Sequence, residues 1–217
     1  MLFEKNVEEL APFCSEEQIQ IAIDGKPSEV ISIDKIKQIA NGVIKNHLTA
    51  VTLTSTLAGI PGSWFIVGTI PADLAQFYGH VLSLAQTLLY LYGMPTMQSD
   101  SGKLTEEATH ILTLSIGVMS GAQVAISTLN QVLNMLAQTI TKQLPKQALT
   151  KSGIYVACKA VAKWLGVELT KKSFSQGVGK ALPLVGAPVS GALTYWTFRP
   201  MANKFKKYLD SNFEVLK

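Results

Sequence analysis

Polar side chains of types that bind ligands or move protons recur along the segment 71–92 of the 217-residue chain. Asp73, Gln76, His80 and Ser83 follow one another at spacings of three or four residues, which would place them on one face of a helix. Asp73 and His80 would lie two turns apart, roughly 10 to 11 Å along the axis, so they could face one cavity without touching. A carboxylate in so apolar a segment needs a cap, a partner or a ligand. Two interpretations follow: Asp73 caps the start of its own helix, or this polar stripe binds a ligand or handles protons.

Patterns for other kinds of site are missing from the sequence. His47, His80 and His110 fall on three different predicted helices, and none is followed by another ligand three or four positions later. We therefore predict no metal site, although one assembled from three helices stays open. No Gly-x-Ser-x-Gly elbow and no Gly-x-x-x-x-Gly-Lys phosphate loop occur. We predict no catalytic residue and no cofactor, and we favour a non-enzyme over an enzyme.

The spacing of apolar residues indicates the helices that would position the stripe. From Ile33 onward apolar side chains recur every three or four residues until Gly59, which predicts one long helix. The stripe belongs to the next helix. Pro71 suits the first position of that helix, and Gly93 suits the residue just after its end.

The end of the first predicted helix and the whole of the second lie in a stretch that is almost without charge. Between Lys45 and Asp100 the only formally charged residue is Asp73. A helix exposed to water normally carries a charged face, so this stretch is expected to be buried or half-inserted in a membrane. Gly59 and Pro61 interrupt it, and no unbroken apolar run reaches the roughly 20 residues that span a bilayer. The sequence therefore predicts a broken apolar hairpin.

A second uncharged stretch, 108–141, is long enough for two helices or for one kinked helix. Gly117, Gly121 and Ala125 recur in it at every fourth residue, and small residues at that spacing form a groove that another helix can approach closely. We interpret these three residues as a helix-packing face. A specific dimer face within a membrane is the alternative.

The C-terminal third differs from the rest of the chain in charge. Residues 142–217 contain 13 cations and 3 carboxylates, whereas residues 1–141 contain 6 cations and 12 carboxylates. This excess of positive charge favours an anionic partner. Phospholipid is preferred over nucleic acid, because Arg199 is the only arginine that could read base edges. Aromatic residues beside lysines suit a membrane interface, although an ordinary amphipathic helix gives the same pattern. The residues that we assign to lipid binding are Lys171, Lys172, Lys180, Trp196, Arg199, Lys204, Lys206 and Lys207.

Two passages of the chain resemble a known family. The first consists of Gly59-Ile60-Pro61-Gly62, Ile70-Pro71-Ala72-Asp73-Leu74 and Leu91-Tyr92-Gly93. The second consists of Gly179-Lys180-Ala181-Leu182-Pro183-Leu184-Val185-Gly186 and Lys204-Phe205-Lys206-Lys207-Tyr208. Together they are similar to the EcsC family of bacterial proteins over about residues 33–210, and the first also resembles a membrane-associated domain attached to some bacterial GTPases. The resemblance implies an all-helical, membrane-associated cytoplasmic protein, and it implies no reaction or catalytic residue.

Composition and pattern together predict one all-α domain. Charged residues make up 16% of the chain and the mean hydropathy is +0.25, which excludes a disordered protein. Cys14 and Cys158 are too few for a disulfide framework, so a reducing compartment is expected. We predict a single bundle of about seven helices. It would comprise a polar N-terminal segment 1–32, apolar hairpins over 33–144, and a cationic helical module over 145–217 packed on the same core.

These observations predict a membrane-associated protein rather than a catalyst. Its expected partners are an anionic phospholipid membrane and a protein, either a membrane protein or a second copy of this chain, with no nucleic acid. Its expected location is the cytoplasmic side of the membrane. Two alternatives stay open: a pore-forming or membrane-permeabilising effector whose hairpins insert, and an enzyme that acts on a lipid through the polar stripe.

Overall fold

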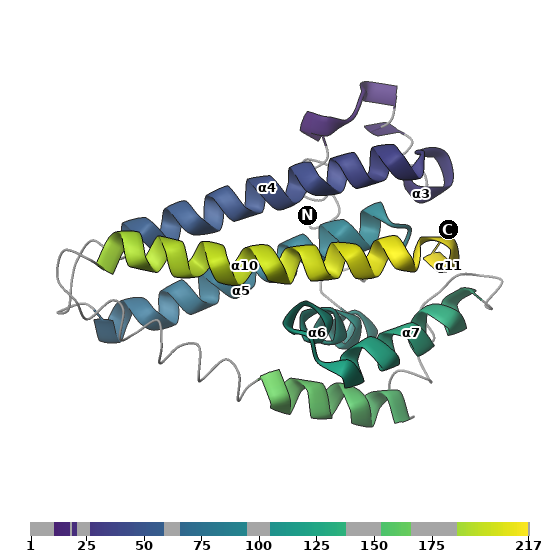
Figure 1. Cartoon of the computed structure of the whole chain (residues 1–217). Helices are drawn as coiled ribbons and strands as arrows, with labels where there is room; N and C mark the ends of the chain where they lie inside the picture. The colour runs from purple at the N-terminus through teal and green to yellow at the C-terminus, as the bar shows by residue number, and fades with distance from the viewer. Residues whose placement is uncertain are drawn as a thin grey trace.

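The computed structural model describes residues 11–17, 19–20, 27–58, 66–94, 105–137, 153–165 and 186–216, and within these ranges every regular element is a helix. The predicted all-α class is therefore confirmed. The elements are η1 (Ala11–Phe13), α3 (Pro27–Val30), α4 (Ile33–Ala58), α5 (Ile66–Leu91), α6 (Glu106–Ser120), α7 (Gln123–Ala137), a helix over residues 153–165, α10 (Gly186–Ser211) and α11 (Phe213–Leu216) (Figure 1).

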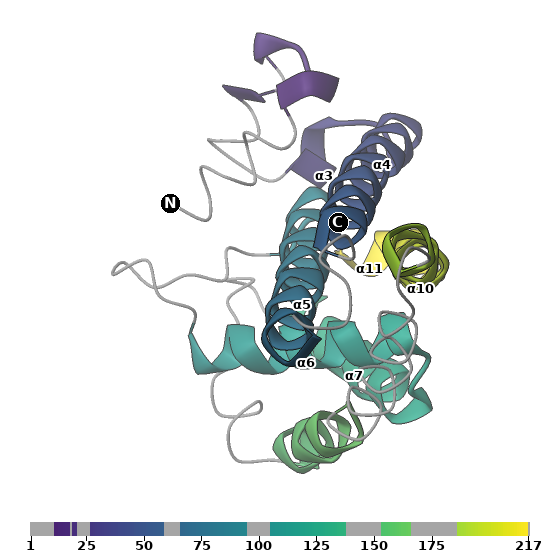
Figure 2. The ribbon, with the colours of Figure 1, turned by 90° about the vertical axis from the view of Figure 1, so that its left-hand side faces the viewer.

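The three long helices α4, α5 and α10 pack against one another and form one layer of the molecule (Figure 1). Figure 2 shows these helices nearly end-on, with α6 crossing the view beneath them. Helices α6 and α7 form a second layer, and the helix over 153–165 lies on the far side of that layer in both views. Helix α10 contacts α4, α5 and α6, so the last long helix completes the core that the α4–α5 hairpin begins.

The core contains the apolar faces that the helical spacing indicates. Phe77 of α5 packs edge to face against Phe198 of α10, with ring centroids 5.9 Å apart. Aromatic pairs in this geometry contribute roughly 0.5 to 1.5 kcal/mol beyond the burial of their surface. The largest side chains that are fully enclosed are Tyr92, Phe198, Phe205, Ile36, Ile39, Leu84, Leu88, Leu89, Leu91, Ile111 and Leu114.

Helix α4 has the bounds that the sequence pattern predicts. It follows Ser32, whose Oγ accepts a long hydrogen bond of 3.4 Å from the backbone N–H of Lys35. Asp34 lies in the first turn, where the helix dipole favours a negative charge. The helix ends at Ala58, directly before the glycine that was expected to stop it.

Helix α5 begins earlier than predicted, and this corrects the interpretation of Asp73. The helix starts at Ile66, so Pro71 lies inside it and Asp73 lies two turns from its start. No acidic residue occupies the first turn, so Asp73 is not the N-terminal cap. The apolar residues before Pro71 continue the helix, and Pro71, which has no backbone N–H, leaves one helical hydrogen bond unmade inside it.

Gly93 ends α5 in the left-handed conformation that the sequence suggested for this position. Its φ is +103°, and the backbone N–H groups of Gly93 and Met94 donate to the carbonyls of Tyr90 (3.1 Å) and Leu89 (2.9 Å). A Cβ atom at Gly93 would lie 2.2 Å from the Ser28 Oγ. The backbone of α5 therefore approaches α3 too closely for any side chain.

The second uncharged stretch forms two helices, α6 and α7, which meet at a glycine. Thr105 caps α6 by accepting a hydrogen bond of 3.1 Å from the N–H of Ala108, and Gly121 ends the helix with a φ of +90°. Because Gly121 is this turn residue, Gly117, Gly121 and Ala125 do not form a groove along one helix. Gly117 instead faces α7, where its Cβ would lie 2.5 Å from the Cβ of Ala125.

Candidate functional site

The polar stripe predicted on α5 lies on one helix, but its members differ in their surroundings. Ser83 is buried, whereas Gln76 and His80 are half-buried, so the stripe passes from the edge of the core into it. The backbone of Asp73 belongs to α5, but its side chain lies outside the described residues.

The structure brings His47 of α4 to this stripe. The Nδ1 atoms of His47 and His80 are 3.2 Å apart, and the two rings meet edge to face with centroids 5.4 Å apart. His47 is only 7% exposed. The sequence analysis missed this contact because His47 lies among the regularly spaced apolar residues of α4, where a histidine is interpreted as one more core residue. The available signal was that both histidines lie on the inward faces of neighbouring antiparallel helices.

The histidine pair can hold one proton between its rings. Two Nδ1 atoms at this distance form a hydrogen bond when one ring donates and the other accepts. Within the described part of the chain, no three His, Cys, Asp or Glu side chains converge as metal ligands. The third histidine, His110, lies elsewhere and packs edge to face against Tyr155, with ring centroids 5.4 Å apart.

We expect His47 and His80 to be energetically coupled. In a double-mutant cycle with His47→Leu and His80→Leu, the coupling free energy should be about 1 kcal/mol, the usual net contribution of one hydrogen bond. Urea unfolding of the four proteins measures it. The same cycle between His47 and His110 serves as the control and should give a value near zero. Equal coupling in both cycles would contradict a direct contact between the two rings.

The two cysteines show no sign of an activated thiol. Burial raises the pKa of the Cys158 thiol to about 11, and burial also raises the pKa of Cys14, with Lys35 opposing that shift. A raised pKa lowers the fraction of thiolate, which is the nucleophilic form. Neither cysteine has the electrostatic surroundings of a nucleophile.

Helix α10 presents a cationic face to solvent. Trp196, Arg199, Asn203 and Lys207 are exposed and follow at spacings of three or four residues, and the exposed Lys204 lies beside them. Trp196 is 70% exposed, which is high for so large an apolar ring. Within 191–211, the described side chains of this helix, no exposed residue is acidic. Lys171, Lys172 and Lys180, the other predicted lipid-binding lysines, lie outside the described residues.

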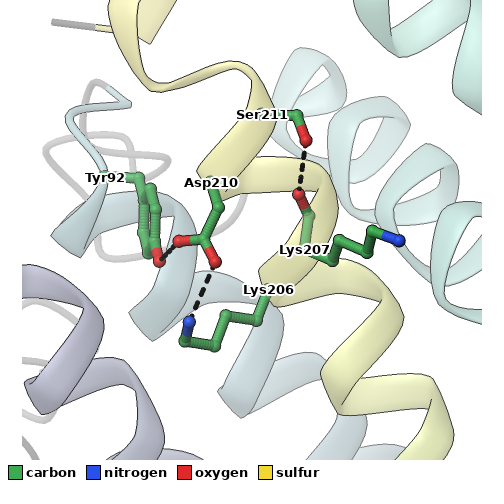
Figure 3. Close-up of polar contacts among 5 residues, drawn as sticks. All are labelled: Tyr92, Lys206, Lys207, Asp210 and Ser211. Carbon is green, nitrogen blue, oxygen red and sulfur yellow. Dashed lines mark hydrogen bonds and ion pairs between the residues drawn. The ribbon is translucent and has the colours of Figure 1, made fainter.

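Lys206 differs from the other cations of α10 because it has a carboxylate partner. Its Nζ lies 2.9 Å from the Oδ2 of Asp210, and the Oδ1 of Asp210 accepts a hydrogen bond of 2.5 Å from the Tyr92 hydroxyl (Figure 3). The Lys206 and Asp210 side chains are 15% and 24% exposed. Asp210 therefore joins α10 to the end of α5, and it largely offsets the charge of Lys206.

The helix over 153–165 adds cations and apolar side chains to the surface. Lys159 and Lys163 are exposed, and the Lys159 Nζ lies 4.4 Å from the centroid of the Tyr155 ring. Val156 is 66% exposed and Trp164 is 38% exposed. This helix therefore combines positive charge with apolar surface, as α10 does.

No family model, curated protein or solved structure matches the chain. Nor does the described part of the chain contain a helix that is both long and apolar enough to cross a membrane.

Proposed function

We propose that this protein binds the anionic surface of a membrane as a helical protein of the EcsC type, on the cytoplasmic side, without catalysing a reaction. The observation that carries the proposal is the exposed face of α10. It presents Arg199, Lys204 and Lys207 together with the exposed ring of Trp196, and it presents no exposed carboxylate. A membrane protein or a second copy of the chain remains the proposed protein partner.

Simple electrostatics supports this surface as a lipid contact. Each lysine or arginine close to an anionic bilayer contributes about 1 kcal/mol, and this attraction decays over a Debye length of about 10 Å at 0.1 M salt. Tryptophan favours the interface, where its ring lies at the depth of the headgroups. The Lys206 ammonium already has Asp210 as a partner, so Lys204 and Lys207 carry more of the attraction.

Reversing two charges on this face should weaken binding to anionic vesicles. We expect Lys204→Glu with Lys207→Glu to reduce binding to vesicles containing phosphatidylglycerol by more than tenfold at low salt, since tenfold corresponds to about 1.4 kcal/mol. Sedimentation with vesicles measures the effect. Lys37→Glu with Lys45→Glu on α4 makes the same change in net charge and should have a much smaller effect. Equal losses in both variants would show that net charge, rather than the α10 face, determines binding.

A membrane-permeabilising function is the second candidate. Leu53 of α4 is 58% exposed within the nearly uncharged stretch that includes the end of α4 and all of α5, which suits insertion of an apolar hairpin. Release of a dye trapped in the same vesicles tests this function directly. Binding without dye release would favour surface association, whereas release that persists at high salt would favour insertion.

A further inference from the structure

A cavity lies between the α6–α7 connection and the helix over 153–165. Its volume is about 310 Å³, and it is partly open to solvent. One wall is formed by Ala122, Gln123 and Val124, and the other by Ala160, Val161 and Trp164. Gln123 supplies the only polar side chain among these residues, so the lining is predominantly apolar.

Large apolar side chains at the mouth of this groove are left in contact with water. Trp164 is 38% exposed and Val124 is 52% exposed. Ala122 and Ala160 are small, which leaves the space between the two walls open. Apolar surface concentrated in a concavity is typical of a ligand-binding groove rather than of ordinary protein surface.

A cation stands at one edge of the groove. Gly121 lines the cavity, and a Cβ atom on Gly121 would lie 3.3 Å from the Nζ of Lys204. Lys163, the neighbour of Trp164 in sequence, is also exposed. No lining residue is acidic. The groove therefore combines an apolar interior with a positive charge at its rim, which is complementary to an anionic amphiphile.

The size of the groove argues against a helix as its occupant. Its volume of about 310 Å³ lies at the lower end of the range for small-molecule sites, roughly 300 to 1,000 Å³. A helix with its side chains is about 10 to 12 Å in diameter and would not enter. A single hydrocarbon chain is narrow enough to enter.

We propose that this groove binds one acyl chain of an anionic phospholipid, with the phosphate of that lipid beside Lys204. The inference rests on the proposed function and specifies it. The exposed face of α10 attracts the anionic bilayer, and the groove, whose lining residue Gly121 lies beside Lys204 of that face, takes one chain from it. Lys204 belongs to both surfaces, because it projects from the exposed face of α10 and its ammonium lies beside the α6–α7 connection.

Short-chain phosphatidylglycerol, added as monomers below its micelle concentration, tests the groove without any bilayer. Binding should shift the Trp164 emission to the blue in a saturable manner, and Trp164→Phe should remove the shift. Ala160→Phe should weaken binding by more than tenfold, because it fills the groove from an exposed helical position, and the smaller change Ala160→Met should give a partial loss. Ala162→Phe is the matched control, since Ala162 is exposed on the same helix and does not line the groove.

The headgroup requirement is tested with the same measurement. Lys204→Gln should weaken the binding of short-chain phosphatidylglycerol by at least threefold and leave the binding of short-chain phosphatidylcholine unchanged. A saturable shift that survives Ala160→Phe, or no shift in the unaltered protein, would overturn the proposal. The proposal would also be overturned if added lipid caused the protein to dimerise instead of binding to the monomer.

Vesicle sedimentation separates this inference from the proposed function. The unaltered protein is tested in parallel against vesicles that contain phosphatidylglycerol and against the short-chain lipid. If the unaltered protein binds the short-chain lipid but not vesicles, the proposed membrane contact of α10 fails and the groove stands. If it binds vesicles but not the short-chain lipid, the groove fails and the membrane contact stands.

Discussion

Gly93→Ala is expected to lower the free energy of unfolding by about 3 kcal/mol or more. Gly93 has a φ of +103°, and the left-handed region costs a residue with a Cβ roughly 1 to 2 kcal/mol. The new methyl group would also lie 2.2 Å from the Ser28 Oγ and 2.9 Å from the Leu216 carbonyl oxygen. Forced overpacking of this kind typically adds 1 to 3 kcal/mol. Chemical denaturation of the two proteins measures the sum.

A second glycine of α5 provides the matched control for this change. Gly79 is exposed, and a Cβ atom placed there would have no neighbour within 4 Å. Gly79→Ala should therefore stabilise the protein by roughly 0.5 to 1 kcal/mol, because alanine favours helix over glycine. Equal stability of Gly93→Ala and the unaltered protein would show that α3 and α11 can move away from the end of α5 at little cost.

Replacing Ser28 distinguishes the two causes of the stability lost in Gly93→Ala, which are backbone strain and overlap with the buried Ser28 hydroxyl. The Ser28 Oγ has no hydrogen-bond partner among the residues that the structure describes, so Ser28→Ala should be close to neutral in an otherwise unaltered chain. In the Gly93→Ala background, the same change removes the closest contact and leaves the backbone strain. A partial recovery of stability is therefore expected, and full recovery would mean that strain at Gly93 contributes little.

Local signals in the sequence predicted most of the helix ends. The apolar period and Gly59 placed α4 correctly, and Gly93 placed the end of α5, because each depends on residues within a few positions of one another. The start of α5 was predicted wrongly because Pro71 was taken as the first helical residue. The apolar residues that precede it support helix equally well, and propensity alone does not separate these alternatives.

Contacts between distant parts of the chain could not be predicted in the same way. His47 and His80 were both visible in the sequence, but their contact depends on the rotation of α4 against α5, which no local pattern specifies. Asp210 was counted as one acid among many cations, and no local pattern pairs it with Tyr92. The register between helices is decided by how whole faces pack.

The same limit applies to the surface proposed to bind lipid. Charge along the chain indicated a cationic C-terminal third, and α10 does present cations on one face. Nothing in the sequence distinguishes Lys204, Lys206 and Lys207 from one another. In the folded protein, the Lys206 ammonium lies beside the Asp210 carboxylate, and the Lys204 ammonium lies beside Gly121. The groove arises between the α6–α7 connection and a helix that follows them in the chain, so only the packed structure reveals it.

Tyr92 links the end of α5 to the end of α10 through a charged acceptor. Its hydroxyl is fully buried and donates a hydrogen bond to the Asp210 carboxylate. The same carboxylate forms an ion pair with Lys206 (Figure 3). Hydrogen bonds to charged groups contribute roughly 1.5 to 3 kcal/mol. Tyr92→Phe should therefore lower the free energy of unfolding by about that amount near pH 7. The ring would keep its edge-to-face contact with Phe213, in which the ring centroids are 6.2 Å apart.

The loss caused by Tyr92→Phe should shrink as the pH rises above about 10, the ordinary pKa of tyrosine. Burial raises the pKa of Tyr92, and the hydrogen bond and negative charge of Asp210 raise it further. The unfolded chain therefore loses this proton first. The stability contributed by Tyr92 is complete below the unfolded pKa and falls as the pH rises toward the higher folded pKa. Burial also raises the pKa of Tyr208, and that of Tyr90 to about 12, so both proteins lose further stability in alkali.

Urea unfolding of the unaltered protein and of Tyr92→Phe, at intervals from pH 7 to pH 11, measures the difference between them. We expect a nearly constant difference up to about pH 10 and a steady narrowing above it. Tyr195→Phe is the control, because the Tyr195 hydroxyl accepts from an exposed arginine, Arg199, at 2.8 Å and should contribute little. A difference that stays constant to pH 11 would mean that Tyr92 ionises as readily in the folded protein as in the unfolded chain, and that the buried link between α5 and α10 does not hold this proton.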